Sequence, residues 1–383
     1  MKVVAFLINQ LRKSGPVNVL YDLVANIDRT RYKPIVIKLM ADDPDRNITV
    51  EFEEIGIEVI SFKFSFWDLE LRTKKVAHII GDCLLEKGVS LLHSHGYHPL
   101  LISSYVNLDI IKLDTQHCIS IDSFRASRGR IIGTYMHYRY VYRLKKISAA
   151  VSISKSVKDY YSRFSFPILI HMIYNGVNIG QFELAGHDKQ YWKKKLGFEN
   201  VNLLIVVVGH LSKLKDPLLI VKAYVSMVEQ GYLKKSLLLF CGTGSEEKKC
   251  RVLTQNYPQV IYKGYVFNVA DYLKAADISI CASHSEGFGL NYIEALASGA
   301  LVLSSKIPTF NEFSQIYPLL QKYQFDKGNQ KELEVLLGLV EKEIENIDDI
   351  KDDVIMRFSS NRMAKEYMEL YDVYLSKQSK IGS

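Results

Sequence analysis

The residues best suited to chemistry lie in one short stretch, Ser285-Glu-Gly-Phe-Gly-Leu-Asn-Tyr-Ile-Glu294. Two carboxylates, Glu286 and Glu294, flank a Gly-Phe-Gly sequence at the point where an apolar run gives way to helical spacing. Gly287 and Gly289 lack a Cβ, so the backbone can approach a ligand closely. A helix that begins here presents free N–H groups, which favour an anion. Because carboxylates accept hydrogen bonds from neighbouring hydroxyls, the stretch predicts a site for a sugar and its phosphates.

Parallel sheets are expected to position these residues. Short β-branched runs alternate with longer amphipathic runs along the chain, which is typical of βα units. Two successive sets of such runs predict an α/β fold with two doubly wound, Rossmann-like domains. We expect domain boundaries at residues 1–180 and 181–357, followed by a C-terminal helix, residues 358–383, that packs back on the N-terminal domain. The predicted strands cover residues 3–8, 34–38, 57–60, 91–93, 149–153, 168–170, 203–208, 237–241, 260–262, 278–281 and 301–303.

Bulk composition excludes several classes of protein. A chain of 383 residues suits two domains, with 48% apolar and 24% charged residues and no apolar run of membrane-spanning length. The first eight residues favour a strand over a signal peptide. The five cysteines are scattered and form no C-x-x-C pair, so neither a disulfide framework nor a zinc site is predicted. We therefore expect a cytoplasmic protein.

The net charge of +7 is unevenly distributed. Residues 1–180 carry 24 Lys and Arg against 17 Asp and Glu, whereas the remainder is balanced at 25 against 25. The surplus peaks in residues 125–163, where ten basic residues accompany a single acidic residue, Asp159, and Tyr135, Tyr138, Tyr140 and Tyr142 are interleaved among the basic residues. This pattern fits peripheral docking on anionic lipid headgroups at the inner face of the membrane, and it fits a solvated basic face beside the acceptor cleft equally well. Nucleic acid is not an expected partner because no single-strand-binding motif accompanies the charges.

Several short motifs follow one another in an order that is specific as a set. They are residues 11–23, His93-Ser-His-Gly, Thr115-Gln-His117, Ser152-Ile-Ser-Lys, residues 173–177, Val208-Gly-His-Leu-Ser-Lys-Leu-Lys215-Asp, Cys241-Gly-Thr-Gly244, and the Glu286 and Glu294 pair with seven residues between. With these motifs the chain resembles the retaining nucleotide-sugar glycosyltransferases of family 4. The resemblance implies the GT-B fold, in which two Rossmann-like domains face a central cleft. Residues 1–180 would then be the acceptor side and residues 181–357 the nucleotide-sugar-binding domain.

The resemblance also implies roles for individual residues. The catalytic set would be Glu286 beside the donor sugar, Lys215 on the diphosphate and His117 near the reacting carbon. The implied donor-binding set is Gly15, His210, Gly287, Phe288, Gly289, Leu290, Asn291 and Glu294, the last on the ribose hydroxyls. Three of these residues have a plainer interpretation: Glu294 as a helix-dipole partner, Lys215 as a solvated lysine and His117 as a structural histidine.

Two positions depart from the family pattern. His210 stands where arginine is usual, and an imidazole lacks the permanent charge and forked geometry with which arginine holds a phosphate. Ser14 stands where a second glycine often precedes the helix, while Gly15 retains the backbone freedom and Pro16 suits the first helical turn. With histidine at position 210, either the bound diphosphate favours a protonated His210 or the diphosphate depends more heavily on Lys215.

The implied reaction is a metal-independent, retaining, hexosyltransferase-type transfer. A sugar would pass from a nucleotide donor, a UDP-sugar first among them, to a glycan or lipid-linked glycan acceptor in bacterial cell-surface polysaccharide synthesis, with no cofactor. Charge gathers on the departing phosphate, and Lys215 and the helix N-terminus would stabilise it. The alternative is a nucleotide-sugar-binding protein of the same fold without turnover. Asp43-Pro-Asp45 is the only D-x-D sequence, and its polar surroundings predict a solvated turn rather than a metal site.

A dinucleotide oxidoreductase is a weaker interpretation. The glycine-containing stretch that begins at Gly242 lacks the third glycine of the dinucleotide-binding fingerprint.

Overall fold

The computed structural model describes residues 1–43, 46–184 and 186–381. The chain forms two compact units, which we describe separately: unit 1 comprises Met1–Gly176 with the C-terminal segment from Ser360, and unit 2 comprises Val177–Ser359. The chain thus passes from unit 1 to unit 2 after residue 176 and returns to unit 1 after residue 359. The expected boundaries were after residues 180 and 357.

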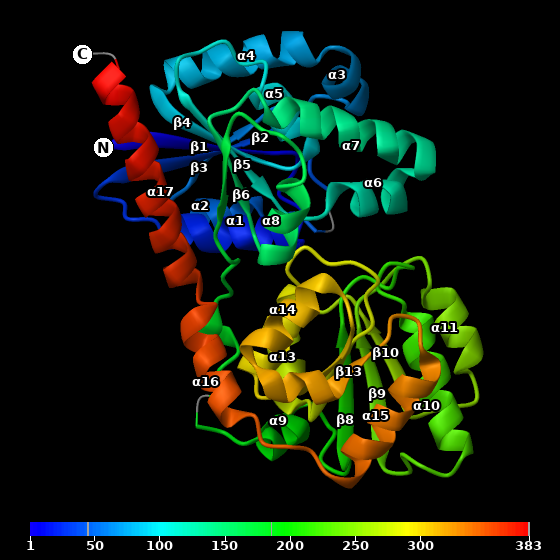
Figure 1. The fold of residues 1–383 in the computed structure, drawn as a ribbon. Helices are drawn as coiled ribbons and strands as arrows, with labels where there is room; N and C mark the ends of the chain where they lie inside the picture. The colour runs from blue at the N-terminus through cyan, green and yellow to red at the C-terminus, as the bar shows by residue number, and fades with distance from the viewer. Residues whose placement is uncertain (44–45, 185, 382–383) are drawn as a thin grey trace. The chain divides into compact units, whose positions relative to one another are not determined.

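Unit 1 is built on a seven-stranded parallel sheet with the order β3-β2-β1-β4-β5-β6-β7 (Figure 1). Its strands are β1 (Lys2–Ile8), β2 (Tyr32–Lys38), β3 (Glu58–Ser61), β4 (Val89–His95), β5 (Ile111–Gln116), β6 (Ala149–Ser152) and β7 (Leu169–Met172). Its helices are α1 (Gly15–Ala25), α2 (Thr49–Glu54), α3 (Phe66–Leu71), α4 (Thr73–Glu86), α5 (Tyr97–Ser103), α6 (Ser120–Arg128), α7 (Arg130–Leu144), α8 (Lys155–Tyr161) and α17 (Ser360–Ile381).

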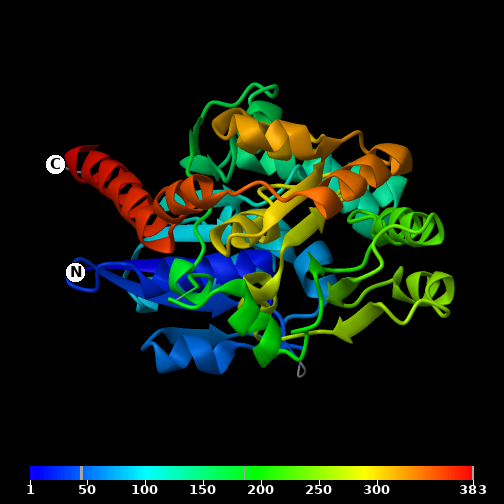
Figure 2. The same ribbon diagram turned by 90° about the horizontal axis from the view of Figure 1, so that it is seen from below.

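The sheet of unit 1 is covered by helices because its strands are apolar on both faces, as expected for parallel strands. Leu7, Ile37 and Leu92 of the strands share one core cluster with Ile80 and other apolar residues of α4. Helix α17 also packs on this unit (Figures 1 and 2), where it contacts α1, β4 and β5. The hydroxyl of its Tyr371 lies 2.8 Å from Nδ1 of His93 in β4.

Unit 2 contains a six-stranded parallel sheet with the order β10-β9-β8-β11-β12-β13. Its strands are β8 (Leu203–Val208), β9 (Ser236–Cys241), β10 (Val260–Gly264), β11 (Ile278–Cys281), β12 (Leu301–Ser305) and β13 (Gln324–Phe325). Its helices are η1 (Ile179–Gln181), α9 (Lys189–Lys195), α10 (Pro217–Glu229), α11 (Glu247–Leu253), α12 (Val269–Ala275), α13 (Leu290–Ala297), α14 (Pro308–Ile316), η2 (Pro318–Tyr323), α15 (Gln330–Lys342) and α16 (Asp348–Arg357).

The prediction of two Rossmann-like, parallel-sheet α/β domains is confirmed. Every predicted strand overlaps an observed one, but β5 and the two-residue β13 were not predicted. The sequence of β5, Ile-Lys-Leu-Asp-Thr-Gln, is too polar to suggest a central strand. Its Asp114 is nevertheless fully buried, and it accepts hydrogen bonds from Tyr140 Oη at 2.5 Å and Ser94 Oγ at 2.8 Å. Those partners compensate the burial of a polar side chain.

Strand order reverses once in each sheet, between β1 and β4 in unit 1 and between β8 and β11 in unit 2. Open parallel sheets bind ligands at this point, beyond the carboxyl ends of the two central strands, because the following loops diverge to opposite faces there. The topology therefore singles out the loops after these strands. No helix in the described part of the chain is long and apolar enough to cross a membrane.

Candidate functional site

The loops after β8 and β11 meet at the reversal point of unit 2. Because β8 and β11 are parallel neighbours, their carboxyl ends lie at the same edge of the sheet. The backbone N–H of His284, after β11, donates to the carbonyl oxygen of Leu214, after β8, at 2.7 Å. This bond joins the loop that carries Lys215 to the loop that carries Glu286.

Lys215 and Glu286 form an ion pair at this junction. Glu286 Oε1 also accepts a hydrogen bond from Ser283 Oγ at 2.7 Å, and the backbone carbonyl of Glu286 accepts one from Thr309 Oγ1 at 2.8 Å. The Lys215 side chain keeps 29% of its surface exposed, against 11% for Glu286. Lys215 is therefore anchored yet accessible to an anion, whereas Lys213 is exposed and forms no ion pair with any described residue.

Asp216 follows Lys215 and was not predicted from the sequence. It adopts a left-handed backbone conformation, with φ of 46°, and caps α10 by accepting the N–H of Leu219 at 3.3 Å. Its other oxygen lies 3.0 Å from Nε2 of His284. Strained non-glycine residues cluster at functional sites, and the Asp-Pro step at the start of a helical run was the available signal.

Ser283 and Thr309 were also missed. Their hydroxyls fix the Glu286 carboxylate and backbone as described above, and no spacing rule connects Thr309, 23 residues further along the chain, with that loop. They would position Glu286 rather than touch a ligand themselves.

Glycines allow three loops to pack closely around the site. A Cβ on Gly242 would lie 1.9 Å from the carbonyl oxygen of Gly209, and one on Gly244 would lie 2.2 Å from that of Leu211. The loop after β9 thus lies directly on the loop after β8. Gly289 has φ of 80°, and a Cβ there would lie 2.7 Å from the Phe310 ring, so both the turn and the packing require glycine.

The N-terminus of α13 lies within the predicted stretch. Gly289 is its N-cap residue, and Leu290 and Asn291 begin the helix. The N–H of Tyr292 donates to the Gly289 carbonyl at 3.0 Å, so among the described backbone groups only the N–H groups of Leu290 and Asn291 are left at the helix start without a backbone acceptor. Helix N-termini of this kind favour anions. The Asn291 side chain donates instead to the carbonyl of Val208 at 3.1 Å, which ties the helix to the end of β8.

Phe288 has a buried side chain. Its side chain is 2% exposed and packs against Phe313 and Phe358, with ring centroids 5.4 and 5.7 Å away. The phenyl ring therefore anchors the loop and is not available to contact a ligand.

Glu294 lies in the second turn of α13 and is half-buried. Burial raises the pKa of Glu294 to about 7, and the positive charge of Lys215 counters that rise only in part. No side-chain hydrogen bond to Glu294 is formed within the described residues. A desolvated carboxyl group without a donor is suited to accept hydrogen bonds from a ligand that supplies hydroxyls.

His210 lies in the loop after β8. It is exposed, and its side chain forms no hydrogen bond or ion pair with the described residues. It stands on the same loop as Lys215. The loops after β8 and β11 thus carry His210, Lys215, Glu286 and residues 287–289, and α13 carries Leu290, Asn291 and Glu294.

Gly15 and His117 belong to unit 1. Gly15 begins α1, directly after the loop that follows β1, with Pro16 in the first turn as predicted. His117 follows β5, and its Nε2 lies 2.9 Å from Nδ1 of His95. Burial lowers the pKa of His117 to about 4, so the imidazole is neutral near pH 7.

The remaining candidates for metal binding are few. Asp43 pairs with Arg12, with Oδ2 and Nε 3.4 Å apart, while Pro44 and Asp45 of the D-x-D sequence lie outside the described residues. Across the described ranges, no three His, Cys, Asp or Glu side chains are grouped so that they could hold a metal ion.

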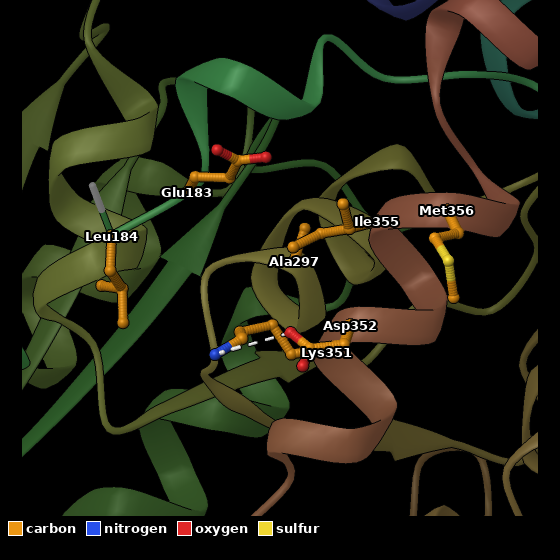
Figure 3. A pocket seen from close by; sticks show the side chains of 7 residues that line it. All are labelled: Glu183, Leu184, Ala297, Lys351, Asp352, Ile355 and Met356. Carbon is orange, nitrogen blue, oxygen red and sulfur yellow. Dashed lines mark ion pairs between the residues drawn. The ribbon is translucent and has the colours of Figure 1, made fainter. Parts of the chain in front are cut away.

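A separate cavity of about 410 Å³ lies at the other end of α13 (Figure 3). Ala297, the last residue of α13, lines it together with Lys351, Asp352, Ile355 and Met356 of α16, and with Glu183 and Leu184. Lys351 is paired with Asp348 and Asp352. The cavity contains none of the predicted site residues.

Comparison with known proteins identifies the family of the chain. The model of the Glycosyltransferase Family 4 domain matches residues 13–181, and that of Glycosyl transferases group 1 matches residues 188–350. An alpha-monoglucosyldiacylglycerol synthase from Streptococcus pneumoniae is 25% identical over 55% of each chain, and an N-acetyl-alpha-D-glucosaminyl L-malate synthase from Bacillus anthracis is 20% identical over 84% of each. The alignment with the first of these relatives spans only about half of its length.

Solved structures show the same fold. The Anabaena protein HepE, crystallised with UDP-glucose, superposes with a TM-score of 0.79 over 97% of this chain and 100% of its own, at 16% identity. The two parallel-sheet units and the order of motifs agree with these matches. The chain therefore belongs to the family 4 glycosyltransferases and has their GT-B fold.

Proposed function

We propose that the protein is a retaining, metal-independent glycosyltransferase that moves a hexose-type sugar from a UDP-sugar to a glycan or lipid-linked glycan acceptor. The observation that carries this proposal is the Lys215–Glu286 ion pair, which lies at the sheet reversal of unit 2 in the loops beside the free N–H groups of α13. It combines a cation, a carboxylate and a helix N-terminus where a sugar diphosphate needs all three.

Binding of the donor would redistribute these contacts. The β-phosphate would compete with Glu286 for Lys215, and the N–H groups of Leu290 and Asn291 would receive phosphate oxygens. Glu286 would then be released toward the sugar, still held by Ser283. The ribose hydroxyls would donate to the carboxylate of Glu294.

Transfer would depend on stabilising the leaving group. Charge builds on the β-phosphate as the bond to the sugar breaks, and fixed donors in a partly desolvated site stabilise such charge more than water does. The acceptor would attack from the face that the phosphate leaves and give its proton to a phosphate oxygen, so no protein nucleophile is needed. His117, neutral near pH 7, and the Gly15 loop would serve the acceptor side.

The matched proteins favour this substrate class. One relative is named for synthesis of a glycolipid, and one structural neighbour was crystallised with UDP-glucose. We infer bacterial cell-surface polysaccharide or glycolipid synthesis, in the cytoplasm and at the inner face of the membrane. The alternative is a nucleotide-sugar-binding protein without turnover, because His210 lacks the permanent charge of arginine.

The test begins with thermal shift against UDP, GDP and ADP, followed by a nucleoside diphosphate release assay with the matching sugar donors. We expect UDP to stabilise the protein most. Lys215→Ala should slow release by roughly 10²–10³-fold, as for other lost oxyanion donors, whereas the exposed control Lys213→Ala should stay within about twofold. Binding without release would favour the alternative, and equal rates in the two variants would contradict the assigned site.

A further inference from the structure

Helix α7 is apolar on two opposite sides. Its inner side buries Met136, Tyr140, Val141 and Leu144 against the rest of unit 1. The outer side exposes Ile131 (86%), Tyr135 (62%), Tyr138 (62%) and Tyr142 (56%), with Ile132 (59%) beside them. Positions 131, 135, 138 and 142 follow one another at spacings of four and three residues, so they form a single stripe along the helix. A stripe of this size on a solvated helix indicates a binding surface.

The hairpin of α6 and α7 holds this stripe in place (Figure 1). Gly133 allows the two helices to touch, because a Cβ there would lie 2.5 Å from the backbone of Phe124. Ser120 Oγ lies 2.7 Å from Nδ1 of His137, and Tyr140 is hydrogen-bonded to Asp114 in the sheet. Tyr140 is therefore a core residue and not part of the surface, which corrects the grouping of four tyrosines made from the sequence.

Helix α3 adds two exposed side chains next to α7. Arg139 of α7 pairs with Glu70 of α3, which brings the two helices together. Trp67 lies one turn before Glu70 and Leu71 directly follows it. Their side chains are 66% and 77% exposed, respectively. We call Trp67, Leu71, Ile131, Ile132, Tyr135, Tyr138 and Tyr142 the aromatic face.

Basic side chains surround the aromatic face. Arg128 and Arg130 lie before the stripe and Lys145 and Lys146 after it, all exposed. None of the four forms an ion pair with a carboxylate of the described residues. The two carboxylates of α3 are already paired, Glu70 with Arg139 and His98 and Asp68 with Arg72. In α6 and residues 125–163, the exposed acidic side chains are Asp122 and Asp159. The face is thus apolar at its centre and positive at its ends.

Three occupants are chemically conceivable, and charge together with apolar character decides among them. A second copy of the chain would place the same basic residues opposite one another across a two-fold axis, which repels. A nucleic acid would match the charge and could stack on the tyrosines, but it offers nothing to Ile131, Ile132 and Leu71. An anionic bilayer satisfies both properties, since Tyr and Trp favour the headgroup region, aliphatic side chains enter the acyl boundary, and Lys and Arg bind anionic headgroups.

We propose that the aromatic face docks unit 1 on a bilayer that contains anionic lipids. The benefit of docking rests on the proposed function, because a lipid-linked acceptor would be presented at that surface. Docking itself does not require transfer, and it can be measured without any donor.

The experiment is flotation of the full chain with vesicles of phosphatidylcholine alone and vesicles that also contain phosphatidylglycerol. We expect flotation only with the anionic vesicles. Each basic residue near such a surface contributes about fivefold to partitioning, so the triple variant Arg130→Ser, Lys145→Ser, Lys146→Ser should bind about a hundredfold more weakly. The matched control, Lys234→Ser with Lys235→Ser, removes exposed charges from unit 2 and should bind like the unchanged chain.

The aromatic contribution is tested separately by Tyr135→Ser with Tyr138→Ser. Both side chains are solvent-exposed, so the fold should be retained, and circular dichroism and melting temperature check this. Binding that persists at high salt should be lost in this variant, because salt screens the charges but not the apolar contacts. The exposed control Tyr232→Ser in unit 2, 46% exposed in the parent, should have no effect.

The outcomes separate this proposal from the proposed function. The docking proposal is overturned if the variants of the aromatic face and its basic residues float as well as the control variants, or if the parent chain does not float with anionic vesicles. Loss of self-association in the tyrosine variant by sedimentation, without flotation of the parent, would assign the face to a second copy instead. If the basic triple variant and the tyrosine variant no longer float but still release UDP, docking is supported and the transfer mechanism is unaffected. If the parent chain floats but releases no UDP, only the proposed function is contradicted.

Discussion

Glu294→Gln should stabilise unit 2 at alkaline pH while weakening nucleotide binding. Glutamine keeps the shape of the side chain and removes its ionisation. Burial raises the pKa of Glu294 from 4.5 to about 7 in the folded protein. A carboxyl group whose pKa is raised on folding favours the folded state while it is protonated, and that contribution is lost as the pH rises from about 4.5 through 7.

The size of the effect follows from the pKa. A rise of about 2.5 corresponds to on the order of 3 kcal/mol at pH 8. Solvent reaches part of the half-buried side chain, so we expect about 2 kcal/mol of stabilisation at pH 8 and none at pH 4.5. At roughly 2–4 °C per kcal/mol for a unit of this size, the melting temperature should rise by roughly 4–8 °C.

Tryptophan fluorescence can follow unit 2 alone. Trp192 lies buried in unit 2, and Trp67, the other tryptophan, is exposed in unit 1 and can be replaced by phenylalanine in both proteins. Exposed Glu343→Gln is the control and should change little at either pH. UDP affinity should fall by about 10–100-fold in Glu294→Gln, the cost of charge-assisted hydrogen bonds to the ribose. Equal stability changes at pH 4.5 and pH 8, or unaltered UDP affinity, would refute the reasoning.

Three further predictions concern the same loops. Gly242→Ala should destabilise the folded protein by about 3 kcal/mol in urea titrations, because its Cβ would overlap the Gly209 carbonyl. The control Gly81→Ala, where the Cβ meets open space, should not lower the stability. Similar losses of stability in the two variants would contradict the packing around Gly242. Glu286→Gln should slow transfer by roughly 10²-fold or more with the fold intact, and wild-type turnover would exclude the residue from the site. His210→Arg should tighten UDP binding above neutral pH by calorimetry; affinities unchanged from pH 6 to 8 in both forms would reject a charge deficit there.

Sequence alone located the main parts of the candidate site because they depend on local spacing. Gly-Phe-Gly between two carboxylates requires a turn and a helix start, and Gly289 and Leu290 occupy those places in the structure. The alternation of strand and helix patterns was similarly sufficient for the two sheets. Strand β5 was not predicted because its polar residues are stabilised by distant partners. Ser94 and Tyr140 donate hydrogen bonds to Asp114, and no pattern within residues 111–116 indicates these partners.

Tertiary structure decided which side chains meet and in what environment. Lys215 pairs with Glu286, 71 residues away, and the pKa of Glu294 depends on burial that its own helix does not specify. The same holds for the tyrosines of α7, whose inward or outward direction is set by which side of the helix Gly133 brings against α6. Periodicity along a chain determines the secondary-structure elements and their turns. The burial of a side chain, its charge state and its contacts are determined only when the fold brings loops from separate strands to one edge of a sheet.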